Sequence, residues 1–249
     1  MKLTIIETGL VPAPIRADFP DYPEMFRRMV AAQDAAIVCE TVSVVKGEAL
    51  PDPTTLDAVL YTGSPAGVYD DEPWIAPLMD FIRGSAAAQT PQVGICFGHQ
   101  AMGEALGGMV TKSDKGWGIG RHTYEVVQCP DWAASPCPPA LSVAVSHQDQ
   151  VVVRPEAASV IARSEFTPYA GLAYRGFPAI SFQCHPEFEP DYAAALYGAR
   201  RGKSLDAEMA DAAIASLGGE CDRRLLASWI VSFLRQHSSQ GRAGQPPKR

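Results

Sequence analysis

The cysteine at position 96 stands where a thiol could act as a nucleophile. It follows a short apolar run that reaches Gly94-Ile95, and a second glycine, Gly98, comes two residues after it. The pattern G-x-C-x-G is the cysteine counterpart of the nucleophile elbow G-x-S-x-G, in which glycines permit a sharp turn from strand to helix. The first N–H groups of that helix and its dipole favour the thiolate. We therefore predict that Cys96 is a nucleophile.

A cysteine that only fills the core is the alternative interpretation, because cysteine is among the most buried residue types. However, glycine weakens a strand. A core cysteine therefore gains nothing from one glycine two positions before it and another two positions after it. The flanking pair favours a nucleophile at Cys96.

A thiol nucleophile needs a base, and the base needs a group that holds its ring. His185 is the best placed of the five histidines, since it leaves an apolar strand expected over residues 177–182. Pro186 favours extended backbone at His185. Alternation along that backbone places His185 and Glu187 on the same side, where a carboxylate can reach the imidazole. The sequence predicts His185 as the base, whereas Cys184 points the other way and is expected to be buried.

The other histidines have less support. His99 falls in the helix after the cysteine, and we expect it to hydrogen-bond beneath the turn. His147 falls in a loop after a strand, where it could contact a substrate or simply be exposed. His122 and His237 have no supporting context.

Strands and helices alternate in the half of the chain that must position these groups. Apolar runs predict strands over residues 3–10, 37–45 and 58–61, and apolar residues at helical spacing predict helices that start near Pro23 and Trp74. Strand-helix-strand order is typical of a parallel sheet with right-handed crossovers. Ligands of such sheets bind at the carboxyl ends of the strands. The loop at Gly63-Ser64 and Cys96 should therefore open onto one crevice.

Shorter strands and turns are expected after residue 108. The glycines of residues 115–120 lack the context of a nucleotide site and predict a hairpin or loop. The proline-rich residues 129–139 predict a surface loop whose two cysteines lack the spacing of a zinc site. A strand over 141–145 should resume at 151–153, and strands over 160–162 and 172–174 should pair.

One domain is expected over residues 1–237, with a core of 1–190 and a helical extension of 191–237. The extension could cover the edge of the sheet or narrow the crevice. Residues 238–249 are rich in Gly, Pro, Ser and charge, so we expect a disordered tail.

Composition is that of an ordinary globular protein, with 47% hydrophobic and 20% charged residues. The net charge of −7, without a large basic cluster, disfavours nucleic acid as a partner. Six irregularly spaced cysteines do not resemble a disulfide framework. The first apolar run is too brief for a signal sequence, and no stretch is long enough to span a membrane. The cytoplasm is therefore the expected location.

Three segments together resemble a known family. Residues 94–100 (GICFGHQ), 62–65 (TGSP) and 183–187 (QCHPE), with these intervals, are similar to the class I (triad-type) glutamine amidotransferases, and most to the free-standing, GMP-synthase-like members. The resemblance covers about residues 1–190. It implies a flavodoxin-like, doubly wound α/β fold with a mostly parallel central sheet, helices on both faces and a C-terminal helical segment.

The resemblance also implies a reaction. Cys96 would attack the γ-carboxamide carbon of glutamine, His185 would protonate the departing ammonia, and water would hydrolyse the γ-glutamyl thioester. Glu187 would orient the imidazole. No cofactor or metal is implied.

Binding roles carry over from the same family. The oxyanion would be bound by backbone N–H groups of Phe97 and of the Gly63-Ser64 turn, most of all Ser64. Gln100 would contact bound glutamine. The amino-acid end of the substrate would be bound by one loop, which comprises Ser146, His147, Gln148 and Asp149.

Two positions depart from the family pattern. Many relatives have Gly-Gly-Pro where this chain has Gly63-Ser64-Pro65, which leaves open whether the oxyanion site is preformed. Many have glycine at the position of Gln148, and this larger side chain could alter which γ-glutamyl compound fits.

Three alternatives remain from the sequence. A γ-glutamyl peptidase would use the same triad on peptides or conjugates. The chain has no S-G-G-x-D-S-type ATP pyrophosphatase loop, so any ammonia would pass to a separate synthetase subunit. A non-catalytic subunit would have lost a triad residue, but all three are present. A related cysteine-elbow family of chaperones and proteases usually has histidine where this chain has Phe97.

Overall fold

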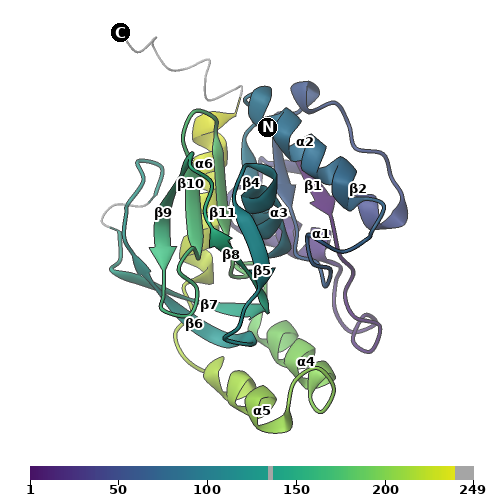
Figure 1. Cartoon of the computed structure of the whole chain (residues 1–249), viewed down its shortest axis with the longest axis vertical. Helices are drawn as coiled ribbons and strands as arrows, with labels where there is room; N and C mark the ends of the chain where they lie inside the picture. Colours follow the sequence, from purple (N-terminus) through teal and green to yellow (C-terminus); the bar gives the residue numbers. More distant parts are fainter. Residues whose placement is uncertain (134–136, 239–249) are drawn as a thin grey trace.

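The structure is a computed structural model that describes residues 1–133 and 137–238 (Figure 1). The strands are β1 (Lys2–Glu7), β2 (Val38–Ser43), β3 (Ala58–Tyr61), β4 (Gln92–Ile95), β5 (Met109–Lys112), β6 (Gly118–Val126), β7 (Ala140–His147), β8 (Asp149–Val153), β9 (Ala158–Arg163), β10 (Gly171–Tyr174) and β11 (Ala179–Phe182). The helices are α1 (Tyr22–Gln33), α2 (Ile75–Ala87), α3 (Phe97–Ala105), α4 (Pro190–Arg200), α5 (Ala207–Ser216) and α6 (Arg223–His237), with short 3₁₀ turns at Val44–Lys46 and Pro53–Thr55.

Among the described residues, nine strands form one sheet in the order β2-β1-β3-β4-β11-β10-β9-β6-β7. The strands from β2 to β11 in this order run parallel. The strands from β10 to β7 extend the sheet in antiparallel fashion. Parallel strands end at the same edge of a sheet, so the segments after β3, β4 and β11 emerge side by side.

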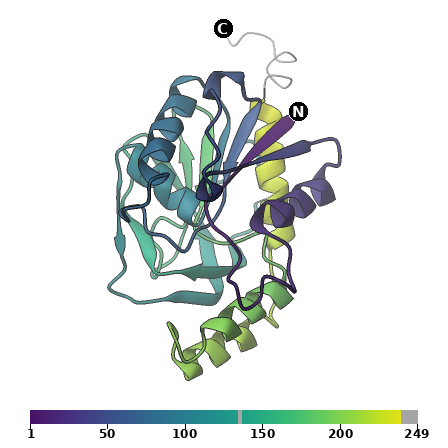
Figure 2. The ribbon, with the colours of Figure 1, turned by 90° about the vertical axis from the view of Figure 1, so that its right-hand side faces the viewer.

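Helices cover both faces of the parallel strands (Figure 2). On one face, α1 and α6 pack together over apolar side chains that include Leu3, Phe26 and Trp229. On the other, α2 and α3 pack over a cluster that includes Leu78 and Met102. Strands buried on both faces consist of continuous apolar runs, because neither side of the strand meets water.

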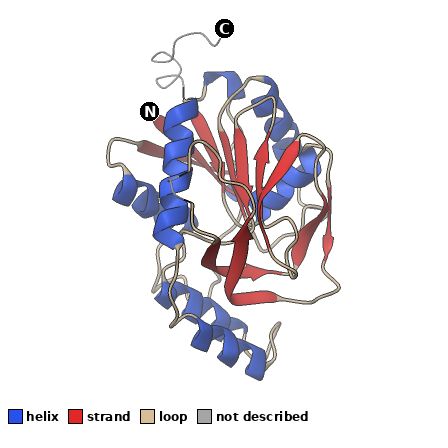
Figure 3. Cartoon of the chain, turned by 90° about the vertical axis from the view of Figure 1, so that its left-hand side faces the viewer, coloured by secondary structure: helices blue, strands red, loops and turns tan. Residues whose placement is uncertain are grey.

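Helices α4 and α5 form a separate pair at one end of the sheet (Figure 3). Tyr192 and Tyr197 of α4 are fully buried there with Val11 of the N-terminal loop. The Tyr197 hydroxyl donates to the Val145 carbonyl at 2.8 Å. The helical extension is therefore attached to β7 at the residue before Ser146, and it lies close to the predicted crevice.

The predicted fold class is confirmed, because the protein is a mixed α/β structure with a large, mostly parallel central sheet and helices on both faces. One strand prediction is wrong: residues 151–153 do not resume β7. They belong to β8, which turns away and pairs with β5 in a second, two-stranded sheet. The strand expected over 37–45 ends at Ser43, where a 3₁₀ turn begins.

Cys129 and Cys137 form a disulfide with a Cα–Cα distance of 5.9 Å. The irregular cysteine spacing did not indicate this disulfide. The tail predicted to be disordered lies outside the described residues from 239 onwards. In the part of the chain that is described, no helix is long and apolar enough to cross a membrane.

Candidate active site

Cys96 occupies a sharp turn between β4 and α3. Its backbone has φ 54° and ψ −103°, a conformation that side-chain-bearing residues rarely adopt. Its side chain is 4% exposed. A residue held in such a conformation costs about 1–3 kcal/mol, and such strain clusters at functional sites. The strained turn is the structural form of the predicted elbow.

Close backbone contacts explain the two glycines that flank Cys96. A β-carbon at Gly94 would lie 2.6 Å from the sulfur of Met102 and 2.7 Å from the carbonyl carbon of Gly98. A β-carbon at Gly98 would lie 2.7 Å from that of Tyr61 in β3. The first turn of α3 therefore rests directly on β3 and β4, and only glycine fits at both positions.

The register of β4 and β11 brings the predicted base to Cys96. Ile95 and Phe182 lie opposite each other as the last residues of two neighbouring parallel strands. The Cys96 N–H donates to the Phe182 carbonyl at 2.9 Å. His185 follows three residues after that strand end, and its N–H donates to the Ala144 carbonyl of β7.

His185 and Glu187 form the expected pair. Nδ1 of His185 lies 2.7 Å from Oε1 of Glu187, and both side chains are almost fully buried. The His185 ring also stacks on Phe188, with centroids 3.9 Å apart and planes within 7°. The carboxylate and the aromatic ring together fix the orientation of the imidazole.

Nε2 of His185 has no hydrogen-bond partner within the described residues. Burial lowers the pKa of His185, but the neighbouring Cys96 and Glu187 raise it by more, so the pKa lies above its usual value. The protonated imidazole is therefore stabilised beside Cys96. That charge state suits a group that must give a proton to a departing amine.

The turn after β3 approaches both side chains. A β-carbon at Gly63 would lie 3.0 Å from Cε1 of His185 and 3.7 Å from the β-carbon of Cys96. The structure thus brings Gly63, Cys96 and His185 around one point, as the crevice predicted from the sequence requires. The pattern T-G-S-P could be recognised, but the contact with His185 depends on the arrangement of three strands.

Thr8 holds this turn in one orientation. Its hydroxyl lies 3.0 Å from the Thr62 carbonyl and 3.2 Å from the Gly63 carbonyl, and its N–H donates to the Thr62 hydroxyl at 3.0 Å. In a trans peptide the N–H points opposite to the carbonyl. The N–H of Ser64, in the same peptide unit, therefore points away from Thr8. Gly9 lets the two loops approach, since a β-carbon there would lie 2.7 Å from the Gly63 oxygen.

Two cavities meet at Cys96, and both are lined by Cys96, Ser64, Ser146 and Arg200. We call the smaller, about 390 Å³, the Trp117 arm, and the larger, about 570 Å³, the Trp74 arm. The Trp117 arm is lined by Ser64, Pro65, Ala66, Gly67, Tyr69, Asp70, Cys96, Gln100, Lys112, Trp117, Ser146, His147, Gln148, Asp149, Arg200 and Ser204. A substrate whose reacting atom is held at Cys96 could extend into both arms.

The loop predicted to bind substrate lines the Trp117 arm, with Ser146, His147, Gln148 and Asp149 all present. Burial raises the pKa of Asp149, whose carboxylate oxygens each lie 3.0 Å from the Tyr69 hydroxyl. Gln148 is half-buried on the wall of the same arm.

Gln100 also lines this arm, and it supports the loop. Its Nε2 donates to the Asp149 carbonyl at 2.8 Å and lies 3.4 Å from Oε1 of Gln183. Nε2 of Gln183 in turn lies 3.7 Å from the Cys96 sulfur. These amides form a buried chain from the sulfur to the loop. The sequence motif contained Gln183 but gave no reason to assign it a role.

The remaining histidines have distinct places. His99 is fully buried under the turn with Nδ1 2.8 Å from the Ser181 hydroxyl, as expected, and burial lowers its pKa to about 3. His147 is the last residue of β7 and is 3% exposed, so it is not an exposed loop residue. Burial lowers the pKa of His147 to about 3 as well, which keeps its imidazole neutral.

Arg200 is the main residue that sequence reasoning missed. It comes from α4, donates from Nη1 to the Ser146 hydroxyl at 2.7 Å, and lies 5.3 Å from the centre of the Trp117 ring. It lines both arms. The helical extension therefore narrows the crevice as well as packing on the sheet end. In the sequence, Arg200 stood out only as part of the pair Arg200-Arg201, and this pair belongs to no recognised motif.

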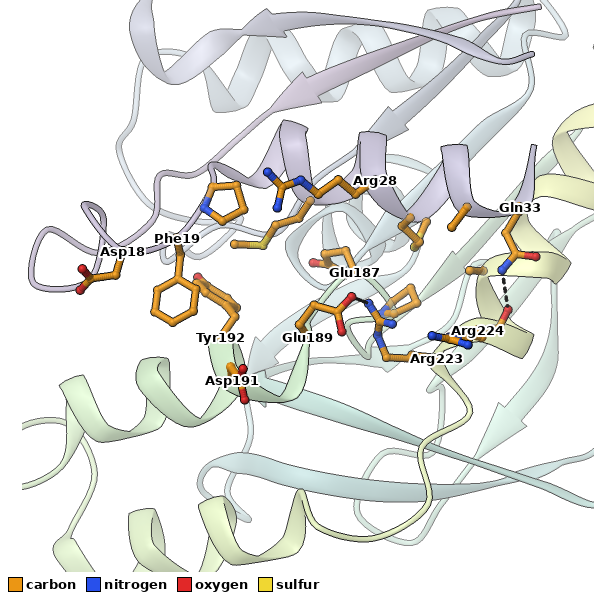
Figure 4. A pocket seen from close by; sticks show the side chains of 16 residues that line it. Asp18, Phe19, Arg28, Gln33, Glu187, Glu189, Asp191, Tyr192, Arg223 and Arg224 are labelled. Carbon is orange, nitrogen blue, oxygen red and sulfur yellow. Dashed lines mark hydrogen bonds and ion pairs between the residues drawn. The ribbon is translucent and has the colours of Figure 1, made fainter. Parts of the chain in front are cut away.

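A third cavity of about 580 Å³ lies beside Glu187 of the His185–Glu187 pair, between α1, α4 and the start of α6 (Figure 4). Glu187 lines it, whereas Cys96 and His185 do not. Oε2 of Glu187 has no hydrogen-bond partner within the described residues. Arg223 crosses the cavity wall and pairs with Glu189. Over the described part of the chain, no group of three or more His, Cys, Asp or Glu side chains is placed to hold a metal.

Comparison with known proteins identifies the family to which this chain belongs. Residues 24–197 match the family model described as glutamine amidotransferase class-I. A crystal structure of a glutamine amidotransferase from Thermotoga maritima superposes with a TM-score of 0.74 at 20% identity, covering 95% of this chain and 97% of that one. At that identity the likeness shows the fold alone.

Two curated relatives differ in activity. Gamma-glutamyl peptidase 5 of Arabidopsis thaliana is 27% identical over 206 residues, which are 79% of this chain and 81% of that protein. A glutamine-hydrolysing GMP synthase of Desulfotalea psychrophila is 36% identical over 135 residues, which are 52% of this chain. That match covers 24% of the GMP synthase, so this chain corresponds to about a quarter of its length.

Proposed function

We propose, since this chain belongs to the class-I glutamine amidotransferase family, that it hydrolyses the amide bond of γ-glutamyl compounds through a thioester on Cys96. The observation that carries the proposal is the strained elbow that holds Cys96 beside the buried His185–Glu187 pair. A thiol, a base and an orienting carboxylate in this arrangement are the parts that nucleophilic acyl transfer needs.

In the first step the imidazole of His185 already holds the proton of Cys96, and the sulfur attacks the γ-carbonyl carbon of the substrate. The carbonyl oxygen becomes an oxyanion. The N–H of Ser64, oriented by the contact of Thr8 with the Gly63 carbonyl, and the N–H of Phe97 in the first turn of α3 are the proposed donors to it. A preformed turn supplies this stabilisation without reorganisation during the reaction.

In the second step the protonated His185 gives its proton to the γ-nitrogen, and the carbon–nitrogen bond breaks. Ammonia or an amine leaves, and the γ-glutamyl group remains on sulfur as a thioester. Water then attacks the thioester carbonyl as His185 accepts its proton. Glutamate leaves when the carbon–sulfur bond breaks, and the sulfur of Cys96 remains beside the protonated His185.

The Trp117 arm is the proposed site of the glutamyl end. That end carries an α-ammonium and an α-carboxylate, and the arm presents charges of both signs from Asp149, Asp70, Lys112 and Arg200. Groups of both signs in one small cavity can pair with the two charges of a zwitterion. The Gln100 contact with the Asp149 carbonyl holds the loop for this purpose.

Free glutamine and γ-glutamyl peptides are both candidate substrates. The GMP synthase relative supports the first, and the gamma-glutamyl peptidase relative supports the second. With glutamine, a synthetase subunit is the proposed acceptor of the ammonia, since one relative is named a glutamine-hydrolysing GMP synthase. A non-catalytic subunit is the alternative from another class, and the complete set of Cys96, His185 and Glu187 argues against it. The proposed location remains the cytoplasm.

The proposal is tested by incubating the purified protein with L-glutamine and with γ-glutamyl peptides while glutamate, ammonia and free amine are measured separately. We expect glutamate release that Cys96→Ala abolishes. Cys184→Ala is the matched control, since Cys184 is also buried but lines neither arm. Glutamate release that survives in Cys96→Ala would exclude the mechanism.

A further inference from the structure

The Trp74 arm is far larger than the smallest leaving group requires. Its volume is about 570 Å³, within the range of about 300–1,000 Å³ typical of small-molecule sites. Ammonia is close in size to water, which occupies about 30 Å³ in the liquid. In the proposed mechanism His185 protonates the leaving amine. Of the two arms, the Trp74 arm is the one lined by His185 as well as by Cys96. It therefore lies where the leaving amine of a γ-glutamyl compound would extend.

Apolar side chains form much of its wall. They come from the loop before α2, the 3₁₀ turn after β2, the start of α1, the segment after β11, and α4. They are Trp74, Val44, Val45, Tyr22, Phe188 and Leu196. Phe188 is fixed by its stack on His185, so this part of the wall directly adjoins the base. Such a wall stabilises a bound apolar side chain by removing its surface from water, whereas ammonia has no apolar surface to bury.

Arg16 supplies a positive charge on the same arm. Its Nε donates to the Val11 carbonyl at 2.8 Å, which anchors the side chain to its own loop. Its two terminal nitrogens have no partner among the residues that the structure describes. A guanidinium anchored in this way presents two parallel N–H donors, the geometry that binds a carboxylate in bidentate fashion.

The other charged side chains that line this arm are less suited to that role. Arg200 lies at the junction of the two arms and is already bonded to Ser146. Glu72 is exposed and would repel a carboxylate. Among the described residues, Arg16 is therefore the arginine that lines the Trp74 arm and not the Trp117 arm.

We propose that the Trp74 arm binds the amine-side residue of a γ-glutamyl peptide, an α-amino acid with an apolar side chain whose free carboxylate is bound by Arg16. This inference rests on the proposed function. If so, the preferred substrates are γ-glutamyl peptides of apolar amino acids, and free glutamine is a poorer substrate. Hydrolysis then releases glutamate and a free amino acid, with water as the only co-reactant.

The test compares three substrates at one pH: γ-glutamyl-leucine, γ-glutamyl-leucine amide and L-glutamine. The amide keeps the apolar side chain but lacks the carboxylate. Each is measured with the wild-type protein, with Arg16→Gln, and with Arg83→Gln as the matched control. Arg83 is an exposed arginine of α2 that pairs with Asp80 and lines neither arm.

We expect kcat/KM to be at least about tenfold higher for γ-glutamyl-leucine than for glutamine, because burial of a leucine side chain is worth about 1.5–3 kcal/mol. Arg16→Gln should lower kcat/KM for γ-glutamyl-leucine about fivefold or more, a modest loss because Arg16 is exposed. It should leave glutamine and the leucine amide unchanged. Arg83→Gln should change none of the three.

Equal or better use of glutamine by the wild-type protein would overturn the inference and leave the proposed function intact. So would an Arg16→Gln variant that lowers kcat/KM for γ-glutamyl-leucine and its amide equally. If the wild-type protein hydrolyses none of the three substrates, the proposed function fails, and the inference fails with it.

Discussion

The backbone strain at Cys96 has a measurable thermodynamic consequence. Its φ of 54° with ψ of −103° suits glycine, which has no β-carbon to clash with the backbone. Alanine retains the β-carbon and so retains the strain, whereas glycine removes it. Comparing Cys96→Gly with Cys96→Ala therefore measures what the elbow costs the fold.

A second buried cysteine provides the control. Cys184 is 2% exposed, against 4% for Cys96, and its φ is not positive. At either position, glycine loses about 0.4–1 kcal/mol relative to alanine through the greater freedom of the unfolded chain, and about 0.8 kcal/mol through the missing methyl group. These losses cancel between the two positions. The remaining difference is the strain at Cys96, about 1–3 kcal/mol.

The assay is urea unfolding of the four variants, Cys96→Gly, Cys96→Ala, Cys184→Gly and Cys184→Ala, with the free energy of unfolding extrapolated to water. We expect the glycine-minus-alanine difference at position 96 to exceed that at position 184 by about 1–3 kcal/mol. Both Cys96 variants should be inactive. Equal differences at the two positions would refute the idea that the nucleophile is held under strain.

Three further predictions concern the groups around the sulfur. Glu187→Gln removes a negative charge that raises the pKa of His185, so the basic limb of kcat/KM against pH should move to lower pH; an unchanged limb would show that another group sets it. Gly63→Ala places a β-carbon 3.0 Å from His185, so kcat should fall at least about tenfold with little change in melting temperature. Thr8→Val removes the hydroxyl that contacts the Gly63 carbonyl, so kcat should fall more than KM rises; a change in KM alone would argue against a role in oxyanion binding.

Local sequence rules were sufficient for the elbow and for the parallel strands around it. Gly94 and Gly98 indicated a sharp turn, and their close contacts with Gly98, Met102 and Tyr61 show why those positions exclude a β-carbon. The pair of His185 and Glu187 was predicted from extended backbone. The structure instead has a turn there, in which the Phe188 N–H donates to the His185 carbonyl at 3.3 Å. Both signals lie within a few residues, which is why a single sequence carries them.

The walls of the two arms could not be predicted in the same way. Arg16, Trp117 and Arg200 come from three separate loops or helix ends, and each lines a cavity that Cys96 also lines. The same limit applies to β8, whose pairing with β5 depends on contacts distant in sequence. Residue types in loops carry little information about which cavity they line.

The disulfide between Cys129 and Cys137 shows another limit of spacing arguments. An irregular set of six cysteines predicts no disulfide framework, yet one pair in a proline-rich loop is close enough to bond. Cys96 remains a free thiol and is buried. The chemistry proposed for it is thus separate from the disulfide.

The central claim is that the sulfur of Cys96 becomes acylated by a γ-glutamyl group. The most direct measurement is acid quenching of the wild-type protein during turnover of a γ-glutamyl substrate, followed by peptide mapping with mass spectrometry. The account predicts a γ-glutamyl adduct on the peptide that contains Cys96 and none on the peptide that contains Cys184. An adduct on another residue during steady turnover would contradict it. So would turnover that is retained in Cys96→Ala.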